Sequence, residues 1–496
     1  MDENTISSDT LEADIPRDQD KSRFPACIAS TGKLFNTTVE TPRAPDKGLS
    51  NTFRSLQWSP DGTCLLTNSA DNILRTFIVP PDLLSGVFHS LTPYASHESP
   101  KPVYASASYP LFDLNRPETT LLLYSPARQP IRFIDALRWF PAANNTPSHS
   151  YEDDEAYTQP TSSIIASYPL INPLTEEFLA PHSLIFTTDN SHFVAGTTSR
   201  LSMFDINYNG QGPIQTHPTI PSRRHIRKGN GVGMKGIIST LSISPATSIL
   251  AAGTFSRWIG LYAAEGAGET VAVFPLPYLH TSKTLIPEAE QGLPGTGVTQ
   301  MKWSPCGRYL YVAERQSDAI IIYDIRVTGK RVGWLKGRNA FSPQRMGFDV
   351  ISRGEGHDVM AGGIDGKVRV WGNPGRGCVR YEDEITEGVM RDVEWEGHED
   401  VVCAAVFHSC GSVLATASGQ QRPRVQFDSN SNSHPSSSDS DTSSDSESES
   451  QPENSSCQEV GRVGSKREQR ERAVRDNSIK IWDLEVTGGC AAEERS

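Results

Sequence analysis

The chain has 496 residues, 36% of them hydrophobic, and its 46 Lys and Arg against 59 Asp and Glu give a formal net charge of −13. Residues 1–20 hold seven acids and one base, and residues 428–457 hold seven acids and no base, so these two segments account for the whole charge. A uniformly acidic chain would be a poor nucleic-acid binder because each phosphate contact needs a cation. Since the remainder is neutral, nucleic-acid binding stays open for it.

Membrane and disulfide-rich classes are excluded by the apolar and cysteine patterns. No apolar run approaches the roughly 20 residues of a membrane helix, and the acidic N-terminal segment lacks the basic and apolar regions of a signal peptide. The eight cysteines are scattered without a CxxC pair, which supports neither a zinc ribbon nor a disulfide framework. We therefore expect a chain that stays in the cytosol or nucleus, without membrane contact.

One pattern recurs seven times: an alternating apolar strand, a short apolar strand rich in small residues, a tight turn, and a strand ending in an aromatic residue or Asp. In chain order the copies are residues 53–77, 103–135, 182–205, 236–262, 298–324, 347–371 and 397–483. Such strands, punctuated by Gly, Pro and Asp, predict antiparallel four-stranded sheets, and seven in series predict a closed propeller. Gly397-His398 and Trp482-Asp483 in the last copy are typical of WD40 repeats. The predicted fold is an all-β, seven-bladed WD40 β-propeller.

The domain organisation follows from where the repeats begin and end. We expect the propeller over residues 51–485, after a disordered acidic leader at 1–50 and before a tail at 486–496. A Ser/Asp-rich stretch has too few apolar residues to offset chain entropy, which predicts a disordered insertion over 421–474. Because this insertion falls between the second and third strands of the seventh blade, it leaves the fold through a turn and separates no domains.

Several segments resemble a known family. Residues 67–75, Thr-Asn-Ser-Ala-Asp-Asn-Ile-Leu-Arg, followed by Pro-Pro-Asp-Leu at 80–83, are similar to the first-blade signature of the telomerase Cajal body protein family of WD-repeat proteins. Further agreement is found at 128–136, 236–246 and 414–420, and the resemblance spans about residues 50–425. It implies a scaffold that binds small Cajal-body RNAs, including telomerase RNA in animals. Fungal members are linked to spliceosomal ribonucleoprotein function.

Motifs of enzymes find little support in this sequence. Residues 231–236 match GxGxxG, but they precede a strand, so no helix N-terminus would face a phosphate. Walker, HExxH and GxSxG motifs are absent, and the twelve histidines show no ligand spacing. We predict no catalytic activity, cofactor, metal or small-molecule substrate, and we expect His398 to bond a buried Asp instead of a metal.

The turns between second and third strands carry the strongest binding signal, because in a propeller they all emerge on one face, together with the connections between blades. Asp71 occupies this turn in the first blade, whereas six of the seven blades place a cation there: Arg128, Arg200, Arg257, Arg315, Lys367 and Arg422. Guanidinium groups match phosphates and stack on unpaired bases, and Trp258 or Phe255 could serve as stacking platforms. The alternative is structural, since turn arginines often pair with a neighbouring acid or cover apolar surface.

Two further features belong to the same face. A basic cluster precedes Gly236 and could be a phosphate clamp, a nuclear localisation signal or a solvated loop: Arg223, Arg224, Arg227 and Lys228. The insertion contains hydroxyl residues with an acid three positions downstream, which makes them phosphorylation candidates: Ser436, Ser438, Thr442, Ser444 and Ser446. The acidic insertion could compete with RNA for this face, or it could be an inert solubilising loop.

Together these observations predict a non-catalytic nuclear scaffold that binds small nuclear or Cajal-body-type RNA and its ribonucleoprotein proteins. It would assist ribonucleoprotein assembly or trafficking, in pre-mRNA splicing or with telomerase RNA. A protein-only interaction scaffold is the alternative, because propeller faces serve both uses. Asp71, Asp365 and Asp476 are expected at equivalent turns, and Gly366 is expected to need a positive φ.

Overall fold

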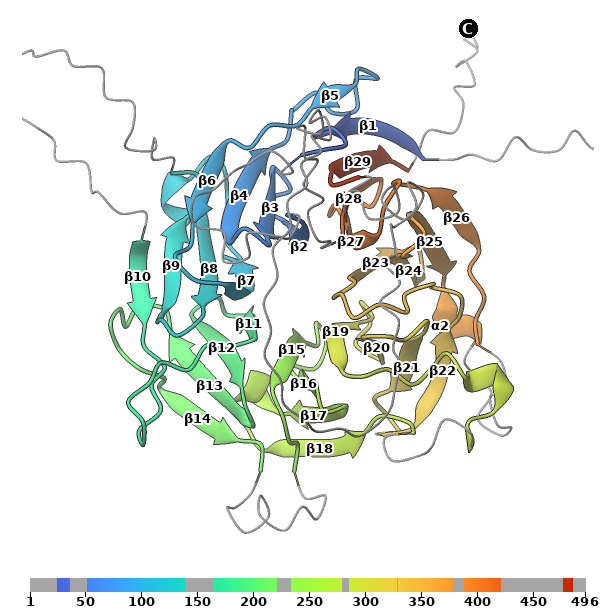
Figure 1. Cartoon of the computed structure of the whole chain (residues 1–496). Coiled ribbons are helices and arrows are strands. Elements are labelled where there is room, and N and C mark those ends of the chain that lie inside the picture. Colours follow the sequence, from blue (N-terminus) through green and yellow to red (C-terminus); the bar gives the residue numbers. More distant parts are fainter. Residues whose placement is uncertain are drawn as a thin grey trace, which may run out of the picture.

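The computed structural model describes residues 25–35, 51–138, 164–220, 233–278, 285–327, 329–377, 388–420 and 476–484. Seven sheets of four or five strands surround a central opening, in chain order around the ring (Figure 1). The predicted all-β, seven-bladed propeller is therefore confirmed. Helices in the described residues are short: η1 (Pro117–Thr119), η2 (Ala264–Gly266), η4 (Glu288–Glu290) and α2 (Pro374–Gly377). Within those residues no helix has the length and apolar character needed to cross a membrane.

Each blade runs from an inner strand at the central opening to an outer strand at the rim (Figure 1). The inner strands are β2 (Phe53–Trp58), β7 (Val103–Ser108), β11 (Ser183–Phe186), β15 (Ile238–Ile243), β19 (Val298–Trp303), β23 (Phe348–Arg353) and β27 (Val402–Phe407). The second strands are β3 (Cys64–Ser69), β8 (Leu121–Pro126), β12 (His192–Thr197), β16 (Leu250–Thr254), β20 (Tyr309–Glu314), β24 (Gly356–Gly362) and β28 (Val413–Ser418).

The two outer positions complete the blades. The third strands are β4 (Ile73–Ile78), β9 (Ile131–Asp135), β13 (Arg200–Asp205), β17 (Trp258–Tyr262), β21 (Ile320–Asp324), β25 (Lys367–Gly372) and β29 (Ile479–Asp483). The outer strands are β6 (Ala95–Glu98), β10 (Ile164–Tyr168), β14 (Gln215–Pro218), β18 (Thr270–Pro275), β22 (Arg331–Leu335), β26 (Val393–Glu396) and, for the seventh blade, β1 (Ala26–Ser30). All seven repeats thus lie where the sequence pattern predicted them.

Strand β1 closes the ring, and this corrects the predicted division that placed residues 1–50 in a leader. Ala26–Ser30 pairs antiparallel with β29, with Ala26 opposite Asp483 and Ser30 opposite Lys480. The short strand β5 (His89–Ser90) then pairs in parallel with β1. Because the first and last strands of the propeller share one sheet, their hydrogen bonds hold the seventh blade against the first.

Packing between blades explains why the second strands are rich in small residues. All six residues of β28 are buried, as are all six of β3. At Gly253 in β16, a Cβ atom would lie 2.7 Å from Val298 Cγ1 of the next blade, which is closer than real Cβ contacts come. Small side chains therefore let neighbouring sheets approach, and the apolar residues of β16 to β21 form one continuous core across the fourth and fifth blades.

The tight turns behave as expected. His398 Nδ1 lies 3.2 Å from Asp476 Oδ2, and its Nε2 lies 2.7 Å from Thr416 Oγ1, which also accepts a hydrogen bond from Trp482 Nε1. The prediction that His398 bonds a buried Asp is confirmed. Gly366 has the predicted positive φ, at +79°.

Arginine takes the place of histidine beside the other two turn carboxylates. Asp71 binds Arg75 at 2.6 Å and Asp365 binds Arg369 at 2.5 Å, in each case across the turn to the residue four positions later. The side chains of Asp71 and Arg75 are almost completely buried. Each acid is thereby matched by a base inside its own blade, which satisfies the charge that the turn buries.

Candidate functional site

The turns between second and third strands do share a face with the connections between blades. Arg315 N–H, in the β20–β21 turn, donates to Gly297 O in the connection before β19 at 2.9 Å. Ser199 N–H, in the β12–β13 turn, donates to Gly236 O in the connection before β15 at the same distance. The backbone positions of the predicted ring are therefore equivalent, but the side chains at these positions differ in their surroundings.

Arg257 is a buried structural residue. Its Nε lies 2.7 Å from Glu314 Oε1 and its Nη2 lies 3.0 Å from Glu314 Oε2, while Nη2 also donates to Pro277 O at 2.9 Å. Only 8% of Arg257 is exposed. A two-point ion pair of this kind is strong and geometrically specific, so Arg257 joins the fourth blade to the fifth and its Nε and Nη2 groups are occupied. The expectation of a ligand-binding role at Arg257 is not supported by this geometry.

The other described members of the predicted ring divide into paired and unpaired groups. Lys367 Nζ binds Glu394 at 3.0 Å, so it too is neutralised within its blade. Arg128 is exposed in the β8–β9 turn, and Arg200 is half-buried opposite Pro218 of β14; neither forms an ion pair with another described residue. Trp258 is partly buried against the core of the fourth blade, which makes it a poor platform for bases.

Several predicted residues lie outside the described residues, and their predictions stand as made. They are the ring member Arg422, the basic cluster Arg223, Arg224, Arg227 and Lys228, and the phosphorylation candidates Ser436, Ser438, Thr442, Ser444 and Ser446.

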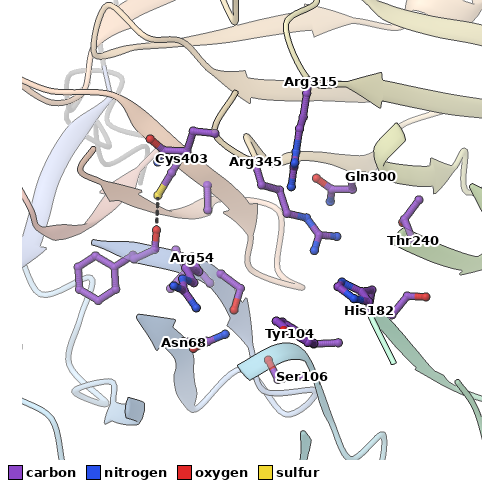
Figure 2. Close-up of a pocket in the computed structure, with 18 of the residues that line it drawn as sticks. Arg54, Asn68, Tyr104, Ser106, His182, Thr240, Gln300, Arg315, Arg345 and Cys403 are labelled. Carbon is purple, nitrogen blue, oxygen red and sulfur yellow. Dashed lines mark hydrogen bonds between the residues drawn. The ribbon is translucent and has the colours of Figure 1, made fainter. Parts of the chain in front are cut away.

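The central opening contains a cavity of about 970 Å³, lined by the inner strands and by the connections on the predicted face (Figure 2). Four of its lining residues are cationic, and none is Asp or Glu: Arg54, Lys302, Arg315 and Arg345. His182 also lines it. Lys302 is the exception among the cations, because its Nζ binds Asp349 at 2.8 Å. No ion pair joins any of the three arginines to an acid among the described residues.

Two β-bulges direct large side chains into this cavity. The register of β2 on β3 passes from Phe53 opposite Ser69 to Ser55 opposite Asn68, so Arg54 is the extra residue. The register of β7 on β8 shifts in the same way at Tyr104. A bulge re-aims the side chain of the residue that it leaves unpaired, and both residues line the cavity.

Three other inner strands carry a bulge at the same position, but there the extra residue is small. The side chains of Ser239, Thr299 and Cys403 are buried and bond to backbone carbonyl groups. The Cys403 thiol, for example, donates to Phe53 O of the first blade, which ties the last blade to the first (Figure 2). The first two blades therefore place a large polar side chain in the cavity, at the position where three other blades carry a small residue bonded to the backbone.

The cations of the cavity interact unfavourably with one another. Burial by the surrounding walls, and then the charge of Arg315, lower the pKa of Arg345 to about 10, although the Arg345 side chain is still reached by water. Burial, followed by Arg345 and Arg315, lowers the pKa of His182. Burial also lowers the pKa of Arg315. Since no acid among the described residues acts on Arg315 or Arg345, an anion in the cavity would stabilise both of their charges.

Aromatic rings stand beside the cations. The rings of Tyr104 and His182 are stacked, with centroids 4.4 Å apart and planes inclined by 10°. Phe255 meets His182 edge-on at 6.2 Å, and the Arg315 guanidinium lies over the Phe255 ring at 4.6 Å. In Figure 2, Arg315 and Arg345 reach into the space in front of the Tyr104 and His182 rings. Tyr104 remains 40% exposed, so part of its ring is open to a ligand.

Sequence reasoning identified Arg315 and Phe255 in this group and missed Arg54, Tyr104, His182 and Arg345. Of the missed residues, Arg54 and Tyr104 could have been found, because each is the second residue of an inner strand, the position at which bulges recur. The described residues contain no group of three or more His, Cys, Asp or Glu side chains able to hold a metal ion. The arrangement is suited to binding an anion with an aromatic part.

The seven blades and the histidine, aspartate, threonine and tryptophan network define a WD40-repeat β-propeller with a cation-lined central cavity. The family model "WD domain, G-beta repeat" matches residues 47–77, which contain most of the first blade. Over most of its length the chain is related to the telomerase Cajal body proteins, which confirms the resemblance predicted from the sequence.

Three relatives define this kinship. Telomerase Cajal body protein 1 of Rattus norvegicus is 26% identical over 83% of this chain and 65% of its own length. Guanine nucleotide-binding protein negative regulator 1 of Schizosaccharomyces pombe is 27% identical over 75% of this chain and 82% of its own. Protein SWT21 of Vanderwaltozyma polyspora is 24% identical over 64% of this chain and 66% of its own. The chain thus spans just under two thirds of the mammalian relative.

Proposed function

We propose that this protein is a non-catalytic nuclear scaffold that binds small nuclear or Cajal-body-type RNA and assists ribonucleoprotein assembly or trafficking, in splicing or with telomerase RNA. The observation that carries the proposal is the group of arginines at the central opening, which no acid of the cavity lining opposes. The names of the relatives support the nuclear setting and the ribonucleoprotein context. A WD40 propeller is typically a platform for binding, which supports a non-catalytic role.

The chemistry of the cavity suits single-stranded RNA. Guanidinium groups offer planar, paired donors that match the oxygens of a phosphate, and aromatic rings stack on unpaired bases without regard to their identity. Arg315 combines both features, because its guanidinium already lies over the Phe255 ring. We therefore assign the RNA contact to Arg315, which is one of the predicted turn residues, and to Arg54 and Arg345 of the cavity, in place of the other members of the ring.

Crosslinking by ultraviolet light in cells, followed by sequencing of the bound RNA, tests the proposal. The double variant Arg315→Gln/Arg345→Gln removes two charges from the cavity. A charge-matched control is Arg116→Gln/Arg353→Gln, whose side chains are 70% and 52% exposed. Arg116 lies in the β7–β8 connection and Arg353 is the last residue of β23, before the turn into β24, so both are on the opposite face. We expect the cavity variant to lose crosslinked RNA and the control to retain it. Equal recovery of RNA from both variants would contradict the assignment of the RNA contact to the cavity, and no RNA from the wild type would contradict the RNA-binding function itself.

The protein-only scaffold remains a second candidate, favoured by the S. pombe relative, whose name describes a regulator of a guanine nucleotide-binding protein. The same experiment separates the two. Ultraviolet light joins only groups in direct contact, so a scaffold that reaches RNA through another protein yields no RNA after a denaturing purification. The Arg257→Gln variant does not serve this purpose, because loss of its buried ion pair would destabilise the fold.

A further inference from the structure

We propose that the central cavity is a nucleotide-binding site. Arg54, Arg315 and Arg345 would bind the phosphate, and the Tyr104 ring would stack on the base. If the ligand is an unpaired nucleotide of an RNA, this inference rests on the proposed function. The same chemistry could equally be supplied by a free mononucleotide.

The cavity has the dimensions of a ligand site. Its volume of about 970 Å³ lies at the upper end of the range of about 300–1,000 Å³ that is usual for small-molecule pockets. A nucleotide and its neighbouring phosphate fit such a space, whereas a double helix is far larger than the cavity. The walls come from the inner strands, so a ligand held there would contact several blades at once.

An unsatisfied donor points to a missing acceptor. Arg315 Nε is buried and has no hydrogen-bond partner among the described residues. One face of the same guanidinium lies over the Phe255 ring. A buried donor that is left without a partner destabilises the structure that holds it. Asn68 Oδ1, in the same lining, is also buried and has no partner in the part of the chain that the structure describes. A ligand with phosphate oxygens and polar ring edges would satisfy both groups.

The rings distinguish a nucleotide from a plain anion or a phosphorylated peptide. Tyr104, His182 and Phe255 form a continuous aromatic contact beside the arginines. Tyr104 is held in place by the bulge in β7 and by its stacking on His182, so a base would meet a ring that is already oriented. Neither inorganic phosphate nor the serine side chain of a phosphopeptide would gain from this ring.

Calorimetric titration of the full chain tests the inference with four ligands: adenosine monophosphate, inorganic phosphate, a five-residue single-stranded RNA, and a phosphoserine peptide. Arg345→Gln should weaken the binding of the mononucleotide and the RNA at least tenfold. Tyr104→Ala should weaken both by about 5- to 100-fold, as expected for loss of one stacked base, and should leave inorganic phosphate unchanged. Tyr104→Phe should restore the affinity.

A matched control accounts for effects on folding. Tyr208 is 50% exposed in the β13–β14 connection, away from the cavity, so Tyr208→Ala should leave every affinity at its wild-type value. Tyr104 is exposed enough for its truncation to be tolerated, and melting curves of both alanine variants should coincide with the wild type to within a few degrees.

The outcomes separate this inference from the proposed function. Binding of the mononucleotide alone, lost in Arg345→Gln and Tyr104→Ala, supports the site with a free nucleotide as ligand and refutes the RNA function. RNA binding that all cavity variants retain refutes the site but leaves the RNA function standing. The site is also refuted if neither ligand binds at millimolar concentration, or if the phosphopeptide binds in a way that needs Arg345 and not Tyr104.

Discussion

Separating the two partners of the Arg257–Glu314 ion pair should destabilise the propeller strongly. The side chains of Arg257 and Glu314 are 10% and 1% exposed, and two hydrogen bonds of 2.7 and 3.0 Å join them. Removing one partner of a buried pair leaves an uncompensated charge and costs about 3–5 kcal/mol. Arg257→Met and Glu314→Leu should each lower the free energy of unfolding by this amount.

Replacing both partners should recover most of the loss, because an apolar pair of similar volume is often neutral relative to a buried ion pair. Urea denaturation of the wild type, both single variants and Arg257→Met/Glu314→Leu gives the coupling energy directly. An exposed pair supplies the reference: Arg353 and Asp358 lie 3.1 Å apart with the arginine 52% exposed. Breaking that pair should cost only about 0–1 kcal/mol.

RNA binding by the same variants tests whether Arg257 has any ligand role. Under conditions in which Arg257→Met is folded, its affinity for RNA should equal that of the wild type, because the Nε and Nη2 groups of Arg257 are already used by Glu314 and Pro277 O. The opposite result would be an Arg257→Met variant with the same urea midpoint of unfolding as the wild type but without RNA binding. Arg257 would then be a ligand contact, and the reasoning from the ion pair would be refuted.

Three further predictions concern stability. Gly366→Ala should cost at least 1 kcal/mol more in urea denaturation than Gly354→Ala, because both glycines have positive φ but only at Gly366 would the Cβ meet a backbone carbonyl, at 2.1 Å; equal costs would contradict this. Burial, followed by Arg132, lowers the pKa of His97 to about 4, so the unfolded chain binds more protons between pH 6.5 and 4 and stability should fall by about 2–3 kcal/mol over that window. In His97→Gln this fall should be reduced, as thermal melts across the pH range would show. Deleting residues 1–35 should lower the melting temperature by removing Ala26–Ser30 from the last blade, whereas deleting residues 1–24 should not.

The blades could be predicted from the sequence because each is encoded locally. Alternating strands, small-residue second strands and turns with Asp and Gly lie within about 30 residues of one another in most repeats. Closure of the ring is different, since it pairs Ala26–Ser30 with Ile479–Asp483, at the other end of the chain. A strand of five residues without a turn motif of its own carries no local signal of that partner. The boundary of the leader was wrong for this reason.

The site shows the same division between local and distant information. Equivalent turn positions follow from the repeat, so the shared face could be predicted. The partner of each cation comes from another part of the fold: Glu314 lies 57 residues beyond Arg257, in the next blade. Arg345 and His182 come from connections without a recurring pattern. Only the bulge position of Arg54 and Tyr104 repeats between blades, and it is recognisable once the inner strands are aligned.

The neighbouring residues Glu314 and Arg315 explain how a neutral domain acquires a cationic cavity. The Glu314 carboxylate binds Arg257 of the preceding blade, and the neighbouring Arg315 forms no ion pair with any acid among the described residues. Asp349 likewise holds Lys302, Glu394 holds Lys367, and Asp71 holds Arg75. These acids near this face form ion pairs within and between blades. The arginines that remain unpaired with a described acid therefore set the charge of the central opening. The main effect of Glu314→Leu should therefore be to destabilise the fold, and not to make the cavity more basic.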